Sequence, residues 1–144
     1  MHKETITYTD YNDVERTEDY YFNLNQAELL DLETGVTGGY TAMIKKIIAA
    51  QDTPTLMDIF RKLVLMSYGE KSADGRQFIK EDENGHKLAN AFKQTEAYST
   101  LYIKLATDDK AASKFIEGII PAKLRDEYKE VSKKDKNIKA LKEG

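Results

Sequence analysis

The sequence predicts an α+β fold in which an N-terminal β-hairpin is followed by a mainly α-helical bundle. Residues 3–24 alternate between apolar and polar side chains with a period of two, and β-branched and aromatic residues are frequent there. From residue 25 onward, apolar residues recur at helical spacing behind good capping residues. We therefore expect one domain over residues 1–121, with the hairpin at 3–24 and the helical part at 25–121, and a lysine-rich helix or tail over 122–144.

The hairpin is predicted from its turn and its return strand. Residues 10–13 (Asp-Tyr-Asn-Asp) are turn formers whose side chains can bond their own backbone. The return strand would place Tyr20, Phe22 and Leu24 on one face. Its middle part, residues 15–18, is charged on both faces, so we expect it to be solvated and edge-like. An isolated hairpin is marginally stable in water, so its aromatic face must pack on the helices or on another chain.

The helices are predicted from their first residues and their apolar stripes. Four capping sites each predict a helix start: Asn25 with Glu28, Thr53 with Pro54, Thr95, and Thr107 or Asp108. Further helices are expected at 40–48 and 88–92, and Gly69 is expected to end the one that starts at Thr53. The polar residues 70–84 predict an exposed loop with a turn at Asp74 and Gly75 and a short extended piece, anchored only by Phe78 and Ile79.

The composition indicates a protein of a reducing compartment. Of the 144 residues, 40% are apolar and 33% are charged, which is enough for one core inside a solvated surface. There is no cysteine, so disulfides and thiolate metal sites are excluded. No stretch approaches the ~20 apolar residues that cross a bilayer, and the polar start does not resemble a signal peptide. We expect the protein in the cytosol of the cell that makes it and away from membranes.

The charge is unevenly distributed. Residues 122–144 hold seven Lys and one Arg against five acidic residues, which gives a net charge of +3. Since the whole chain has a net charge of −3, residues 1–121 carry a net charge of −6. Duplex binding needs a basic face on the folded domain, so an acidic body argues against nucleic acid as a partner. Lysine-rich helix ends are usually just solvated.

The residues that could form a metal site, a calcium loop or a phosphate loop do not have the spacing or the partner residues that these sites need. His2 stands at the start, where we expect disorder, and His86 has no second histidine at zinc-ligand spacing. A calcium loop centred on residue 85 would put Lys80 and Ala91 at positions that need acidic ligands. The glycine-rich segment 35–39 lacks the Lys-Ser/Thr pair of a phosphate loop. The sequence therefore predicts no catalytic residue, no metal and no cofactor, and favours protein binding.

Candidate partner-binding residues lie near the end of the helix that is predicted to start at Thr107 or Asp108 and to be broken by Pro121. They are Phe115, Ile116, Ile119 and Ile120, which make the segment apolar on more than one side. The competing interpretation, that all four are core residues, is favoured by the ordinary burial of Ile and Phe. Nine tyrosines without any tryptophan add modest support for an interface, since tyrosine is enriched at such surfaces.

Six short segments, none of which carries a chemical motif, form a familiar set: residues 5–11 (TITYTDY), 15–18 (ERTE), 22–24 (FNL), 67–72 (SYGEKS), 95–99 (TEAYS) and 115–121 (FIEGIIP). Together they resemble the tail assembly chaperones of siphophages and prophages of Gram-positive bacteria. The resemblance covers roughly residues 5–121.

The resemblance implies a non-enzymatic assembly factor in the bacterial cytoplasm that is absent from the finished virion. Such proteins bind the tape-measure protein and help to recruit major tail-tube subunits around it, and many exist in a short and a frameshift-extended form, of which this chain would be the short one. Self-association also fits that role. One alternative is a structural virion component, such as a capsid decoration or head–tail joining protein, whose hairpin would add to a neighbour's sheet edge. Another is a small enzyme or nucleotide-binding protein.

Overall fold

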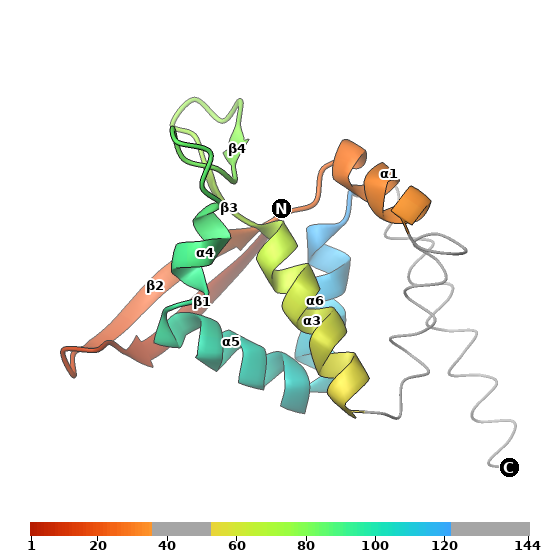
Figure 1. Cartoon of the computed structure of the whole chain (residues 1–144). Coiled ribbons are helices and arrows are strands. Elements are labelled where there is room, and N and C mark those ends of the chain that lie inside the picture. The colour runs from red at the N-terminus through yellow and green to blue at the C-terminus, as the bar shows by residue number, and fades with distance from the viewer. Residues whose placement is uncertain (36–52, 122–144) are drawn as a thin grey trace, which may run out of the picture.

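A computed structural model describes residues 1–35 and 53–121 and has the predicted α+β class. Its elements follow one another along the chain as strands, helices, a short second pair of strands and further helices (Figure 1). They are β1 (His2–Thr9), β2 (Glu15–Phe22), α1 (Gln26–Gly35), α3 (Thr53–Ser67), β3 (Tyr68–Lys71), β4 (Phe78–Ile79), α4 (Leu88–Phe92), α5 (Glu96–Thr107) and α6 (Asp109–Ile119). The predicted helix at 40–48 and the predicted tail at 122–144 lie outside the described residues.

The hairpin of β1 and β2 has the predicted turn. Asp10 Oδ1 accepts hydrogen bonds from the backbone N–H groups of Asn12 at 2.8 Å and Val14 at 3.0 Å. Asp13 has a φ of 60°, a left-handed conformation that Asp tolerates better than most residues. The two strands then pair over their full length, and Figure 1 shows them as an arm whose turn extends beyond the helices.

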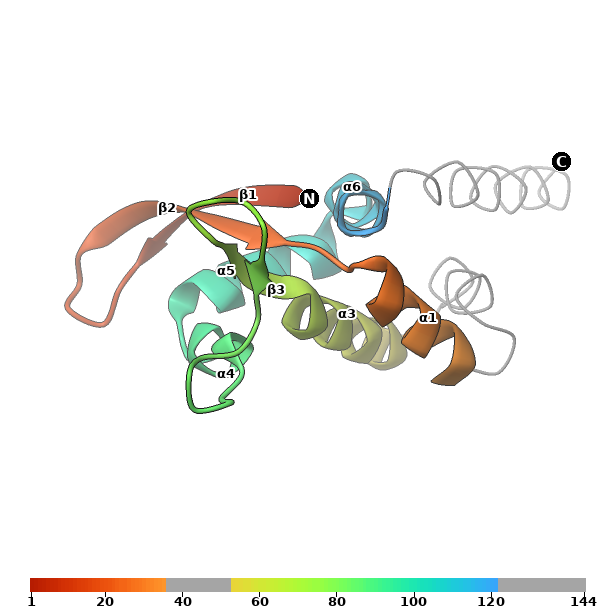
Figure 2. The same cartoon turned by 90° about the horizontal axis from the view of Figure 1, so that it is seen from above.

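The helices cover one face of the hairpin, which is the face that the sequence predicted to be apolar (Figure 2). Phe22 and Leu24 have no exposed surface, and Tyr20 packs against the core beside them. Helix α6 reaches the same core, where the ring of Phe115 lies 5.2 Å from that of Phe22. The backbone N–H of Leu24 donates to Ile119 O at 2.7 Å, so the end of the hairpin and the end of α6 are joined directly.

Three of the predicted caps are confirmed by their hydrogen bonds. Asn25 and Glu28 form a reciprocal capping box, with N–H to side-chain distances of 2.8 and 3.0 Å. Thr95 Oγ1 accepts from the Tyr98 N–H at the start of α5. The cap of α6 is Asp108, whose Oδ1 accepts from the first N–H groups of that helix. Helix α3 begins at Thr53 as predicted, and the side chain of that residue is outside the description.

The prediction that Gly69 ends a helix is wrong. Helix α3 ends at Ser67, and Gly69 lies in β3 opposite Tyr21 of β2. A Cβ atom at Gly69 would lie 2.5 Å from a ring carbon of Phe78 and 2.8 Å from Ile79 O. The absent side chain therefore allows β4 to approach β3. The predicted loop contains the expected short extended piece, which is β4, and also the end of β3, which was not predicted. The sheet order is β1-β2-β3-β4.

The expectation of disorder at His2 is also wrong, because β1 begins there and pairs with the end of β2. Its Nε2 lies 2.8 Å from Oε1 of the buried Glu4, and its ring meets Phe115 edge-on with centroids 5.4 Å apart. A Cβ atom at Gly118 of α6 would lie 2.4 Å from His2 Nδ1, so this glycine makes room for the imidazole.

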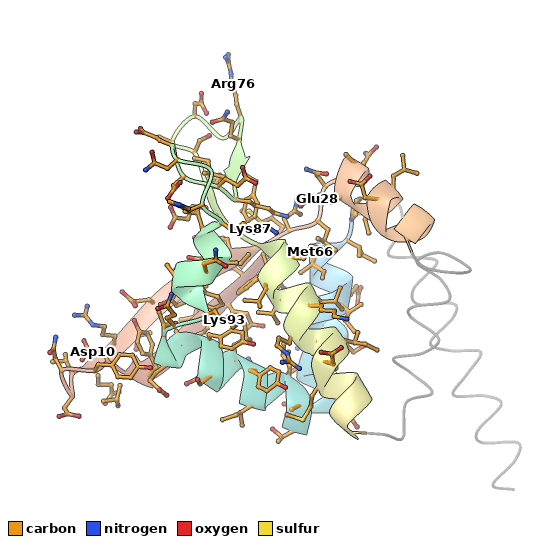
Figure 3. The ribbon with its side chains drawn as sticks, in the orientation of Figure 1. Asp10, Glu28, Met66, Arg76, Lys87 and Lys93 are labelled. Carbon is orange, nitrogen blue, oxygen red and sulfur yellow. The ribbon has the colours of Figure 1, made fainter. Side chains whose placement is uncertain are left out.

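One lysine joins the two halves of the fold. Lys80 Nζ donates to Asn23 O at 2.7 Å, to Glu28 Oε2 at 2.6 Å and to Met66 O at 2.9 Å. Glu28 on α1 and Met66 at the end of α3, both labelled in Figure 3, meet at this junction. The segment after β4 is thereby fixed to the hairpin end, to α1 and to α3.

Candidate partner-binding surface

The sheet opens where β3 leaves β2. The two strands pair only at Tyr21 with Gly69 and at Phe22 with Tyr68. Beyond that point β3 pairs with β4 instead. Residues 15–20 of β2 therefore have a neighbouring strand on the β1 side alone, within the part of the chain that the structure describes. This agrees with the predicted edge-like character of residues 15–18, although β2 is internal in the strand order.

The direction of the backbone groups follows from the alternation along β2. Asn23, just past its end, donates its N–H to Ser67 O at 2.8 Å on the β3 side. Because backbone groups point to alternate sides of an antiparallel strand, those of Glu15, Thr17 and Asp19 point to the same side as those of Asn23. They face away from β1, along the open edge.

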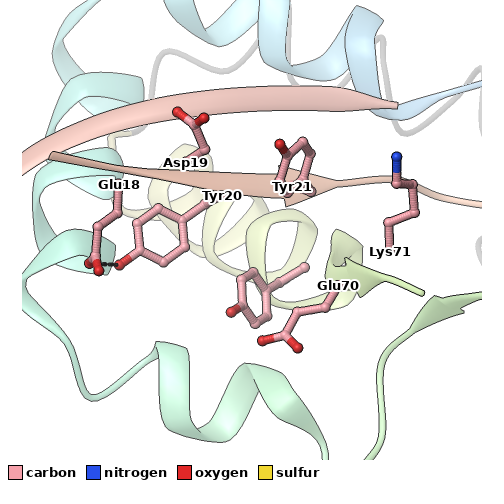
Figure 4. A pocket seen from close by; sticks show the side chains of 8 residues that line it. Glu18, Asp19, Tyr20, Tyr21, Glu70 and Lys71 are labelled. Carbon is pink, nitrogen blue, oxygen red and sulfur yellow. Dashed lines mark hydrogen bonds between the residues drawn. The ribbon is translucent and has the colours of Figure 1, made fainter. Parts of the chain in front are cut away.

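A pocket of about 370 Å³ lies at this opening, and we call it the β2–β3 wedge (Figure 4). It is lined by Glu18, Asp19, Tyr20, Tyr21, Tyr68, Gly69, Glu70 and Lys71. The strand alternation divides its charges between the two faces of the sheet. Glu18 and Glu70 lie on the helix-covered face with Tyr20, whereas Asp19 lies with Lys71 on the other face (Figure 4). The helix-covered side of the wedge thus has two carboxylates and no cation among its lining residues.

Glu18 is held as an anion by two phenols. Its Oε1 accepts from the hydroxyl of Tyr20 at 3.0 Å and from that of Tyr8 across the hairpin. The hydrogen bonds from Tyr8 and Tyr20 lower the pKa of Glu18 below its usual range. Burial, followed by the hydrogen bonds with Tyr8 and Glu18, raises the pKa of Tyr20. At neutral pH the carboxylate is therefore charged and oriented, and the phenols are neutral.

Aromatic rings form the wall of the wedge. Tyr68 stacks on Phe92 of α4 with centroids 4.3 Å apart and planes 7° from parallel, and Tyr20 lies 5.1 Å from Phe92. Burial, with a smaller contribution from the charge of Glu70, raises the pKa of Tyr68. The wedge therefore combines fixed aromatic rings with carboxylates, a lining suited to a cationic side chain.

The four candidate partner-binding residues lie in the core instead. Phe115, Ile119 and Ile120 are 0% exposed and Ile116 is 2% exposed. Both adjacent isoleucines can be buried because α6 ends at Ile119 and Ile120 is extended, with φ −92° and ψ 153°, which redirects its side chain. In this conformation they present no surface to a partner. Partner contact through them remains a prediction that would require the core to open.

The wedge was missed by sequence reasoning because β3 was not predicted. Residues 68–71 contain no β-branched side chain, and the pairing that makes them a strand comes from residues about 50 positions away in the sequence. The available signal was the charge on both faces of residues 15–18, which identified the open edge but not the pocket beside it.

Residues 1–35 and 53–121 contain no group of three or more His, Cys, Asp or Glu side chains that could hold a metal ion. None of their helices is both long and apolar enough to span a membrane. Large exposed apolar side chains are scattered over the described residues: Tyr11 and Val14 lie in the turn of the hairpin, and Leu30, Met66 and Ile103 lie on three different helices. The wedge is accordingly the feature with the clearest binding chemistry in the described part of the chain.

The chain was compared with protein families, curated proteins and solved structures. The family model described as phage tail assembly chaperone matches residues 1–143. No curated protein matches the chain. No solved structure matches it either. Since the family model covers nearly the whole sequence, the chain belongs to the phage tail assembly chaperone family.

Proposed function

We propose that this protein is a non-enzymatic tail assembly factor that binds the tape-measure protein and the major tail-tube protein in the host cytoplasm. The observation that carries the proposal is the family match over residues 1–143. The resemblance of six segments to siphophage proteins of Gram-positive hosts supplies the two clients and the type of phage.

The geometry is compatible with reversible binding of other proteins. An assembly factor must hold its client and then release it, so it benefits from a local docking site rather than a large apolar interface. The open edge of β2 beside a small charged pocket is such a site. The apolar side chains of α6 serve the core of the protein itself.

Co-expression tests the proposal. The tagged full chain is produced with the tape-measure and tube proteins of the same genome, and both are expected to be retained on the tag. A capsid protein from that genome serves as the control and is expected in the flow-through. Failure to retain either tail protein would overturn the proposed function.

A second experiment separates the assembly factor from a structural virion component. Mass spectrometry of purified particles is expected to find the tape-measure and tube proteins without this chain. Presence of the chain at a fixed copy number per particle would instead identify it as a capsid decoration or head–tail joining protein.

A further inference from the structure

We propose that the β2–β3 wedge binds an extended basic segment of the client, which adds to β2 as a strand and inserts a Lys or Arg side chain between Glu18 and Glu70. This inference rests on the proposed function and identifies the site and the chemistry of the client. Three observations carry it: the open edge, the division of charge in the pocket and the aromatic wall.

The open edge supplies the backbone part of the recognition. Glu15, Thr17 and Asp19 direct their N–H and C=O groups away from β1. Strand β3 does not extend alongside these three residues, because its pairing with β2 is limited to Tyr21 and Phe22. Such an edge is a template for an additional strand, whose backbone completes the hydrogen bonds. Because a strand presents alternate side chains to opposite faces, every second residue of the client would face the helix-covered side.

The charge of the pocket selects the side chain on that side. Glu18 is fixed by its bonds with Tyr8 and Tyr20, and its pKa is lowered, so it stays ionised. Glu70 is exposed, and among the residues that the structure describes no hydrogen bond or ion pair engages its carboxylate, although its backbone pairs with β4. Lys71 lies on the opposite face of the sheet, and Arg16, whose charge also acts on Glu18, forms its ion pair with Asp10 at 2.5 Å. The two carboxylates on the helix-covered side therefore favour a positively charged occupant. An acidic or purely apolar client segment would leave them repelled or desolvated.

The aromatic wall and the size of the pocket further limit which side chains can bind there. The face formed by Tyr20 and Tyr68 suits an ammonium or, better, a planar guanidinium, which stacks on aromatic rings. A volume of about 370 Å³ is near the lower limit of small-ligand pockets. It accommodates side chains of a docked segment and excludes a folded domain.

Charge reversal at Glu70 tests the site. Glu70→Lys is expected to weaken binding of the tape-measure or tube protein by about tenfold, because it replaces attraction with repulsion. Glu83→Lys is the matched control: Glu83 is also exposed, its charge change is identical and it does not line the wedge. Circular dichroism and the melting temperature establish that both variants fold. Equal client affinity of Glu70→Lys and Glu83→Lys would overturn the inference.

Peptide probes test the strand geometry. A labelled ten-residue peptide of alternating Arg and Thr is compared with one of alternating Arg and Pro, which has the same charge but lacks half of the backbone donors. By fluorescence anisotropy, the Arg-Thr peptide is expected to bind at least about fivefold more tightly to the wild-type chain. Equal affinity for both peptides would show attraction of charge alone and would overturn strand addition.

The outcomes distinguish this inference from the function on which it rests. If the wild-type chain retains neither tail protein, the proposed function fails. If the wild type retains them and Glu70→Lys retains them equally, only the wedge is wrong. If Glu70→Lys instead lowers self-association of the chain, measured by analytical ultracentrifugation, and leaves client binding intact, the occupant is a second copy and the inference is overturned.

Discussion

Lys80 Nζ lies 2.6 Å from Glu28 Oε2, across 52 positions of sequence, and forms the ion pair that joins the segment after β4 to α1. The same ammonium also donates to two backbone carbonyls, those of Asn23 and Met66. Burial lowers the pKa of Lys80, and the bond with Glu28 opposes that shift. One half-buried cation thus satisfies three acceptors from three different parts of the fold.

Lys80→Met should lower the free energy of unfolding by about 2–3 kcal/mol, since it leaves a half-buried carboxylate and two carbonyls without their donor. Urea denaturation measures the loss. Lys93→Met is the control, because Lys93 is an exposed lysine in the turn after α4, and its unfolding free energy should change by less than about 0.5 kcal/mol. A Lys80→Met variant as stable as this control would contradict the role of the junction.

Because Gly118 contacts His2, the effect of Gly118→Ala on the free energy of unfolding should change sign when the imidazole is removed. Gly118→Ala should destabilise the wild-type chain by about 1–2 kcal/mol, because the new methyl group meets the imidazole at 2.4 Å. In a His2→Gly background, which also removes the His2 Cβ atom that would lie 2.9 Å from the new methyl group, the same change should stabilise by about 0.5–1 kcal/mol, since alanine is the better helix former. A double-mutant cycle from urea denaturation measures both effects. The same sign in both backgrounds would show that the ring does not limit this position.

Ile119→Val distinguishes a core residue from a partner contact. Because Ile119 is fully buried, loss of one methylene should lower the free energy of unfolding by about 0.5–1.5 kcal/mol. The affinity of the folded protein for the tape-measure and tube proteins should stay the same. Thr7→Val, at an exposed position of β1, is the comparison for effects on the surface. A loss of client affinity without a loss of stability would show that Ile119 of α6 contacts the client.

The Tyr8–Glu18–Tyr20 cluster predicts a dependence on acid. Glu18 has a pKa below its usual value of about 4.3, so the unfolded chain binds a proton first as the pH falls. The contribution of Glu18 to stability is therefore complete above that pH and is lost as the pH falls through the folded-state pKa. Melting temperatures of wild type and Glu18→Gln should differ most near pH 7 and converge below about pH 4. A constant difference from pH 7 to pH 3 would contradict the ionised state of Glu18.

What the sequence predicted well was local in origin. The turn at Asp10 and the capping box of Asn25 with Glu28 are determined by residues within four positions of one another, and both formed as expected. The apolar face of Phe22 and Leu24 follows from strand alternation, which is equally local.

What the sequence did not predict depends on distant partners. The sequence around Gly69 predicts a helix end, whereas in the structure β4 packs against this glycine. The position of His2 predicts a disordered start, whereas its ring packs on Phe115. The burial of Ile120 depends on the local end of α6 and on the hairpin that receives it. The wedge forms because β3 pairs with β2 at only two positions and then with β4, and no local sequence pattern predicts this change of partner.

The meeting of β1 with α6 also orders events in time. Phe115, which packs against His2, is made more than a hundred positions after it, and Ile119, whose carbonyl accepts from Leu24, is made about 95 positions after Leu24. The aromatic face of the hairpin must therefore wait uncovered for most of the synthesis of the chain. Contacts of such long sequence separation slow folding relative to a simple helical bundle. Truncated chains that end before α6 should accordingly aggregate, because the aromatic face of the hairpin then stays uncovered.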